Sequence, residues 1–110
     1  MIDLKGHKAL ITGSTQGVGR SIAVAFAAAG ADVLLHGKDA DENAPRVLAE
    51  CRAHGVHAEF IPLHLIGASD SLAAQLFSES HRLLPGIDIL VNNAGQYFDL
   101  PFDQMTLDRF

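Results

Sequence analysis

The sequence predicts an α/β fold, in which helices cover both faces of a parallel sheet. Short apolar runs alternate with stretches of helical periodicity along the 110 residues. This alternation implies parallel strands that are joined by right-handed crossovers. The runs at 8–12 and 87–91 are apolar without alternating with polar residues, as in strands that are buried on both faces. A glycine-rich turn follows the first run directly, where a strand passes into a helix.

The first half of the chain begins with a strand over 8–12. After the turn a helix is predicted over 18–29, and Gly30 ends it. Its apolar residues recur at helical spacing: Val18, Ile22 and Phe26. Residues 32–36 form a second short apolar run, which predicts a second strand.

The second half repeats this pattern twice. A helix is predicted from about 41 to 54, with Gly55 as its stop and with its buried side made of Val47, Leu48 and Cys51. Residues 56–61 alternate apolar and polar side chains, which favours a third strand nearer an edge of the sheet. A third helix is predicted over 69–84 from the spacing of Leu72, Leu76 and Leu83. The strand at 87–91 follows, and a fourth helix is expected to begin at Thr106.

Composition fits one domain and excludes several function classes. Hydrophobic residues make up 48% of the chain, enough for a packed core. The net charge of −5 and the absence of a basic cluster argue against nucleic-acid binding. No apolar run approaches the roughly 20 residues of a membrane span, and the N-terminus does not read as a signal peptide. Cys51 is the only cysteine, so we expect no internal disulfide and a cytoplasmic location.

The glycine turn has a chemical use. The first N–H groups of a helix have no intrahelical partner and carry the positive end of the helix dipole, so they stabilise a phosphate. Gly13 allows a tight turn. Gly17 leaves room for a pyrophosphate near the backbone, and Gly19 lets the helix pack close to the strand. A glycine-rich turn without a ligand is the alternative interpretation of this stretch.

Two motifs together resemble the short-chain dehydrogenase/reductase family. Residues 12–19, Thr-Gly-Ser-Thr-Gln-Gly-Val-Gly, resemble its Thr-Gly-x-x-x-Gly-x-Gly turn. Residues 92–95, Asn-Asn-Ala-Gly, resemble its Asn-Asn-Ala-Gly segment after the fourth strand. The resemblance implies the doubly wound, Rossmann-like parallel sheet, here with its first four strands in the order 3-2-1-4. It makes residues 1–110 a partial dinucleotide-binding domain, truncated before the catalytic half.

The resemblance also implies a set of cofactor-binding residues. The pyrophosphate site is expected to be lined by Ser14, Gln16, Gly17 and Val18, with Gly13 and Gly19 shaping the turn. Asn92 resembles the residue that stabilises the central strands, and Ala94 and Gly95 would lie on the adenosine ribose side of the cofactor. A plain turn after a strand is the alternative for Asn92 and Asn93, because asparagine tolerates turn conformations.

One departure from the family pattern concerns adenine. Relatives usually carry an aspartate at the position of His64, where the carboxylate accepts a hydrogen bond from the adenine amino group. A neutral histidine can still accept through one ring nitrogen, so His64 and the adjoining Leu65 are counted as cofactor-binding residues. The alternative is that His64 is a solvated loop residue.

A second departure concerns catalysis. The family's chemistry uses a serine with a Tyr-x-x-x-Lys motif. The only tyrosine here is Tyr97, with Pro101 four residues on, and no lysine follows Lys38. We therefore expect no catalytic residue and no turnover within these 110 residues. The hypothesis is the cofactor-binding part of an NAD(P)-dependent oxidoreductase that interconverts alcohols and carbonyls. The alternative is a non-catalytic nucleotide-binding or interaction module that uses its open sheet edge, and the same edge predicts a homo-oligomer.

The cofactor is expected to be NADP, with NAD possible. In this fold the choice is made at the end of the second strand, where an acidic residue binds the ribose of NAD. Gly37 holds that place and has no side chain, while Lys38 follows and can pair with a 2′-phosphate. Asp32 lies at the wrong end of the strand. No metal site is expected, because the six histidines lack further ligands at zinc spacing.

Overall fold

The computed structural model of the chain describes residues 2–38, 42–64 and 70–93. In chain order the elements are β1 (Lys8–Ile11), α1 (Gly17–Ala28), β2 (Asp32–Gly37), α2 (Asn43–Arg52), β3 (Ala58–Pro62), α3 (Asp70–Leu83) and β4 (Ile89–Val91). Every predicted strand and helix up to residue 93 is present. The expected helix from Thr106 lies outside the described residues.

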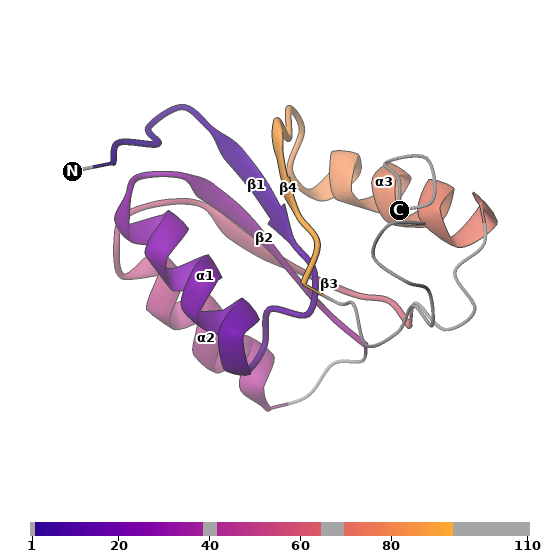
Figure 1. Cartoon of the computed structure of the whole chain (residues 1–110), viewed down its shortest axis with the longest axis horizontal. Helices are drawn as coiled ribbons and strands as arrows, with labels where there is room; N and C mark the ends of the chain where they lie inside the picture. The colour runs from indigo at the N-terminus through magenta and orange to yellow at the C-terminus, as the bar shows by residue number, and fades with distance from the viewer. Residues whose placement is uncertain (1, 39–41, 65–69, 94–110) are drawn as a thin grey trace, which may run out of the picture.

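All strand pairs of the sheet are parallel, and their order is β3-β2-β1-β4, which confirms the predicted order 3-2-1-4. On β1, Leu10 lies between Leu34 of β2 and Leu90 of β4. Helices α1 and α2 cover one face of the sheet, and α3 lies on the other (Figure 1). Because the strands are parallel, their carboxyl ends meet at one edge, and the glycine turn leaves the sheet there.

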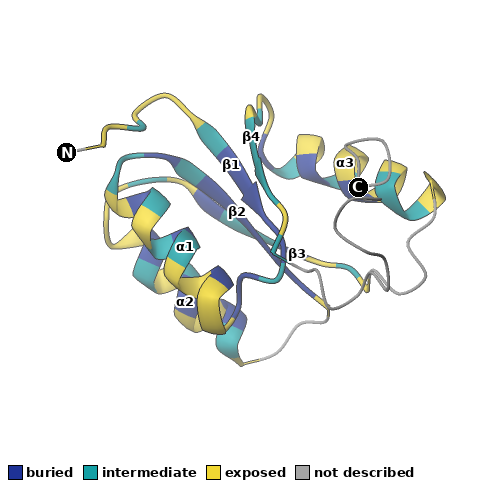
Figure 2. Ribbon diagram, viewed as in Figure 1, coloured by how far each residue is buried: buried dark blue, intermediate teal, exposed yellow. Residues whose placement is uncertain are grey.

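Most residues of β1 and β2 are buried (Figure 2), and each face of the sheet has its own core. One core joins alternate residues of the central strands to α1 and α2, among them Ile11, Leu35 and Val47. The other contains Leu10 and Leu34 beneath α3. All of these side chains are at most 3% exposed. The non-alternating apolar runs of β1 and β2 are explained by this double coverage.

The most buried residues of α1 differ from the three apolar residues that predicted the helix. Its buried residues are Gly19, Ala23 and Ala27, while Val18 is 68% exposed. The small side chains let the helix backbone approach β1 and β2 closely. The helical periodicity was therefore predicted correctly. The most buried positions, however, each lie one residue after the predicted ones.

All four strands differ slightly from their predicted bounds: β1 ends one residue early, β2 and β3 end one residue late, and β3 and β4 begin two residues late. β3 begins at Ala58; the N–H of His57 before it donates to the Asp32 carboxylate at 2.9 Å, and the His57 carbonyl oxygen accepts the N–H of Val33 on β2. β4 covers only Ile89–Val91 and is half-buried in the described structure, whereas full burial was expected. The reason is its place at the edge of the sheet. No helix within the described ranges is long and apolar enough to cross a membrane.

Candidate functional site

The glycine turn takes backbone conformations that only glycine adopts easily. Gly13 has a φ of +60° and Gly17 a φ of +61°. A Cβ built at Gly17 meets nothing within 4 Å, so the space above this residue is open. The turn therefore needs glycine at 17 for its backbone angle, and it leaves room there for a group outside the chain.

Helix α1 begins without a side-chain cap. Gln16 occupies the N-cap position and forms no capping hydrogen bond. No acidic residue lies in the first turn either. In the described part of the chain, the N–H groups of Gln16, Gly17 and Val18 donate to no acceptor. Several backbone donors and the positive end of the helix dipole thus face outward together, an arrangement that binds phosphate groups.

Gly19 brings the start of α1 against the turn itself. A Cβ at this position would clash with the carbonyl oxygen of Gly13 and would come within 2.5 Å of the Asn93 side-chain nitrogen. The close approach holds the first turn of α1 over the ends of β1 and β4. The role expected for Gly19, close packing of helix and strand, is thus visible in the geometry.

Ser14 ties the turn to β2. Its N–H donates to the carbonyl oxygen of His36 at 2.8 Å, and its hydroxyl accepts the N–H of His36 at 2.9 Å. The residue is fully buried. The hydroxyl of Ser14 is therefore used inside the protein, where it fixes the position of the turn relative to the second strand.

His36 continues this link with its side chain. Its Nδ1 accepts the N–H of Gly13 at 3.0 Å, and its Nε2 lies 2.7 Å from the carbonyl oxygen of Leu63. The side chain is fully buried. Burial lowers the pKa of His36 below its ordinary value of about 6.5, and the hydrogen bond to Leu63 opposes this only in part. The imidazole is therefore neutral at physiological pH.

The end of β4 closes the turn from the other side. The N–H of Asn93 donates to the Thr12 hydroxyl at 2.9 Å, and its side-chain nitrogen donates to the Gly13 carbonyl oxygen at 3.1 Å. The Thr12 hydroxyl lies 3.4 Å from the Asn92 side-chain oxygen. Asn93, to which no cofactor role was assigned, therefore makes the two shorter hydrogen bonds to this turn. Asn92 makes a longer contact.

The carboxyl end of β2 reaches the same edge. Gly37 is buried, and a Cβ there would lie 3.1 Å from the methyl group of Thr15 and 3.2 Å from the Phe60 ring. Lys38 follows and is exposed. A larger side chain at position 37 would have to displace Thr15 and Phe60. The first charged side chain after this strand is that of Lys38.

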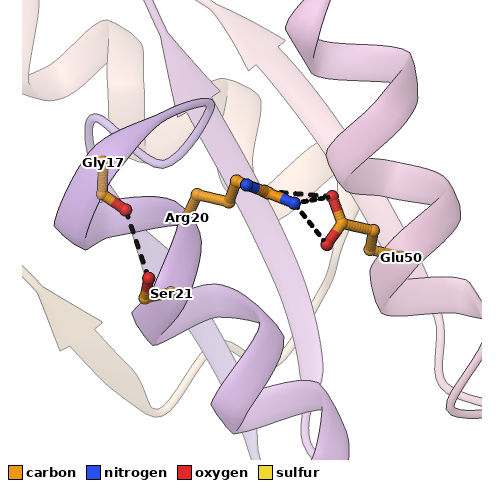
Figure 3. A network of polar contacts seen from close by, with 4 residues as sticks. All are labelled: Gly17, Arg20, Ser21 and Glu50. Carbon is orange, nitrogen blue, oxygen red and sulfur yellow. Dashed lines mark hydrogen bonds and ion pairs between the residues drawn. The ribbon is translucent and has the colours of Figure 1, made fainter.

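A pocket of about 130 Å³ lies between the turn and α2, lined by Thr15, Gln16, Gly17, Arg20, Asn43, Arg46 and Val47. Arg20 is already engaged: its guanidinium meets both carboxylate oxygens of Glu50 on α2, at 2.7 and 2.8 Å (Figure 3). Arg46 is exposed and has no hydrogen-bond or ion-pair partner among the described residues. Among the described residues that line the pocket, Arg46 is therefore a cation without a partner beside the glycine turn.

The remaining expected site residues are only partly visible. His64 is exposed and lies directly after Leu63, whose carbonyl oxygen contacts His36. Leu65, Ala94 and Gly95 lie outside the described residues.

Two residues that the sequence had not singled out hold the turn in place, His36 and Asn93. His36 could have been noticed in the sequence as a polar residue inside an apolar strand. Asn93 could have been noticed because it is adjacent to Asn92.

Ionisable side chains also lie away from this edge among the described residues. In the described ranges no three histidine, cysteine, aspartate or glutamate residues are grouped as metal ligands. Cys51 is buried, as predicted. Burial and the neighbouring Glu50 carboxylate raise the pKa of its thiol to about 11, so it stays protonated and unreactive.

Comparison with known proteins gives one consistent result. A family model described as short chain dehydrogenase matches residues 7–110. A curated relative, the 3-oxoacyl-[acyl-carrier-protein] reductase FabG of Aquifex aeolicus, is 41% identical over 107 residues, which cover 96% of this chain and 42% of the relative. The chain therefore spans less than half the length of that protein.

Solved structures agree. The 3-oxoacyl (acyl-carrier-protein) reductase of Agrobacterium tumefaciens, with NADP bound, has a TM-score of 0.74 and 31% identity, over 97% of this chain and 40% of its own. An NADH-dependent reductase in complex with NAD has a TM-score of 0.72 and 31% identity, over 81% of this chain and 36% of its own.

Proposed function

We propose, from the premise that this chain belongs to the short-chain dehydrogenase family, that it binds a nicotinamide dinucleotide at the carboxyl edge of its sheet. The observation that carries the proposal is the uncapped start of α1 at the glycine turn. When bound, the cofactor supplies hydride transfer between an alcohol and a carbonyl compound. We assign no catalytic residue within these 110 residues, because the family's Tyr-x-x-x-Lys motif is absent from them.

The residues of the edge fit such a ligand in three ways. The N–H groups of Gln16, Gly17 and Val18 belong to exposed residues, have no acceptor among the described residues and suit a pyrophosphate. The space above Gly17 is open. The exposed side chain of Val18 offers an apolar contact that a bound cofactor would cover. Asn92, His64, Leu65, Ala94 and Gly95 complete the proposed site through the family resemblance.

Binding of NADPH by the full chain tests this proposal directly. We expect titration calorimetry to give a saturable one-site isotherm. Val18→Glu should weaken binding, because it places a carboxylate beside the phosphates. An absence of NADPH and NADH binding by the folded chain would contradict the proposed function.

The proposed cofactor is NADP, with NAD as the weaker ligand. Lys38 is exposed at the end of β2, where it can meet a 2′-phosphate, and Gly37 offers no carboxylate to the 2′-hydroxyl of NAD. Arg46 adds a second cation on this side of the turn. From the single cysteine we also propose a cytoplasmic protein, and from the position of β4 at an edge of the described sheet we propose that it self-associates there.

Lys38→Ala is expected to weaken NADPH binding by about tenfold and to leave NADH binding unchanged, because a hydrogen bond to a charged group contributes about 1.5–3 kcal/mol. The wild-type preference for NADPH should shrink as salt rises. Lys5→Ala, an exposed lysine at the opposite end of the sheet near Gly30, serves as the control. Equal affinity for both cofactors in the wild type would overturn the assignment.

We propose that His64 contacts adenine as a hydrogen-bond acceptor. His64→Gln keeps an acceptor at this position and should keep nucleotide affinity, whereas His64→Ala should weaken it. Equal affinity in the wild type and in His64→Ala would show His64 to be a bystander.

A further inference from the structure

His36 connects three segments that are far apart in the sequence. Its ring nitrogens contact the N–H of Gly13 in the glycine turn and the carbonyl oxygen of Leu63 after β3, at 3.0 and 2.7 Å. Its own backbone N–H and carbonyl oxygen bond to Ser14. The side chain is fully buried at the edge of the sheet where the turn begins.

These partners fix the protonation state of the ring. The carbonyl oxygen of Leu63 can only accept, so Nε2 must carry a hydrogen. The N–H of Gly13 can only donate, so Nδ1 must present its lone pair. The network is satisfied by the neutral Nε2–H tautomer and by no other form of the side chain.

We propose that His36 is a positioning residue for dinucleotide binding, holding the glycine turn through the Gly13 N–H so that the outward N–H groups of α1 keep their places. The inference rests on the proposed function above. Gly13 is the first residue of the turn and has a φ of +60°. An acceptor that holds its N–H therefore fixes the direction in which the following residues leave the strand.

Among the described residues, the hydrogen-bond partners of His36 are uncharged: Gly13, Ser14 and Leu63. Side chains alternate along a strand, so His36 lies on the α3 face with Leu34. It is paired with Ile61 on β3, and α3 turns Leu76 and Ser80 inward. Within the described structure, no hydrogen bond or ion pair is seen between His36 and the ionisable residues of these elements, Glu59, Asp70, Glu79, His81 and Arg82. His64 follows β3 and is exposed.

Low pH should therefore weaken the hydrogen bond between His36 and the glycine turn. Protonation turns Nδ1 into a donor that faces the donor N–H of Gly13, and the bond breaks. Because the pKa of His36 is lowered in the folded state, the unfolded chain takes up the proton first as the pH falls below about 6.5. The contribution of neutral His36 is thus complete above this pH and is lost progressively below it.

Two amide variants separate the contacts. His36→Asn places an amide oxygen near the position of Nδ1, where it can accept the Gly13 N–H. His36→Gln places its amide near Nε2, where it reaches Leu63 and not Gly13. At pH 7.5 we expect His36→Gln and the non-bonding His36→Phe to lose at least about tenfold in NADPH affinity. His36→Asn should lose less than about threefold, and its affinity should lack the acid loss of the wild type in a His64→Gln background.

Equal NADPH affinity in the wild type and in His36→Phe would overturn the inference, as would Asn and Gln variants of equal affinity. Failure of the wild type to bind NADPH would instead overturn the proposed function. Where a variant does not fold, ¹⁵N NMR of the wild-type imidazole decides without ligand. The Nε2–H tautomer with a slowly exchanging Gly13 N–H is expected at pH 7.5, and the Nδ1–H tautomer or a charged ring contradicts the inference.

Discussion

Gly19→Ala is expected to destabilise the fold by about 1–3 kcal/mol and to lower dinucleotide affinity by tenfold or more. In an open helix this substitution would instead stabilise by about 1 kcal/mol, because alanine is the better helix former. The new methyl group would clash with the carbonyl oxygen of Gly13, which is backbone and can move only with the whole turn. The steric effect therefore exceeds the gain in helix propensity.

Ser21→Ala is the matched control in the same helix. Ser21 is exposed, and its hydroxyl makes one 3.4 Å contact to the Gly17 carbonyl oxygen (Figure 3). This variant should keep both stability and NADPH affinity. Urea denaturation and calorimetric titration measure the two quantities. A Gly19→Ala protein that is more stable than the wild type would show that the start of α1 is not pressed against the turn.

Leu34→Ala is expected to cost about 2–5 kcal/mol of stability, the range for leucine truncations in packed cores. Leu34 is fully buried on β2, in the core beneath α3, and pairs with Leu10 on β1. Since a whole domain is stabilised by about 5–15 kcal/mol, one such truncation removes a large fraction of it. The cavity would lie two residues before His36 on the same strand.

Ile2→Ala is the control for this prediction, because Ile2 is 74% exposed and should change stability by less than about 0.5 kcal/mol. The measurement is the urea midpoint at constant slope. A loss below 1 kcal/mol for Leu34→Ala would mean that α3 does not cover this face of the sheet tightly.

The sheet could be predicted almost completely from the sequence, because its signals are local. The apolar runs around Leu10 and Leu34 gave the buried strands, and Gly30 and Gly55 marked the helix ends. The start of β3 was less accurate: the N–H of His57 before it bonds to the Asp32 carboxylate, 25 residues away, and no local pattern indicates this contact. Similarly, the exposure of β4 depends on its edge position and not on its own apolar residues.

The candidate site could be predicted only where backbone conformation dictates the residue. Gly13 and Gly17 stand out because few other residues adopt their angles. The contacts of His36 and Asn93 join residues 23 and 80 positions apart. They exist only once the strand order has brought these segments to one edge. Ser14, expected to line the cofactor site, is also buried by a partner on another strand.

The strand order β3-β2-β1-β4 has a consequence for folding during synthesis on the ribosome. β1 is synthesised first, yet one of its two neighbours, β4, ends only at Val91. At about 5–20 residues per second, the nascent chain spends seconds with β1 and β2 made and one flank of β1 still unpaired. Pairing over such long sequence separations is slow to form. Asn93 can hold the glycine turn only after this step, so the carboxyl edge takes its described form only once β4 has paired with β1.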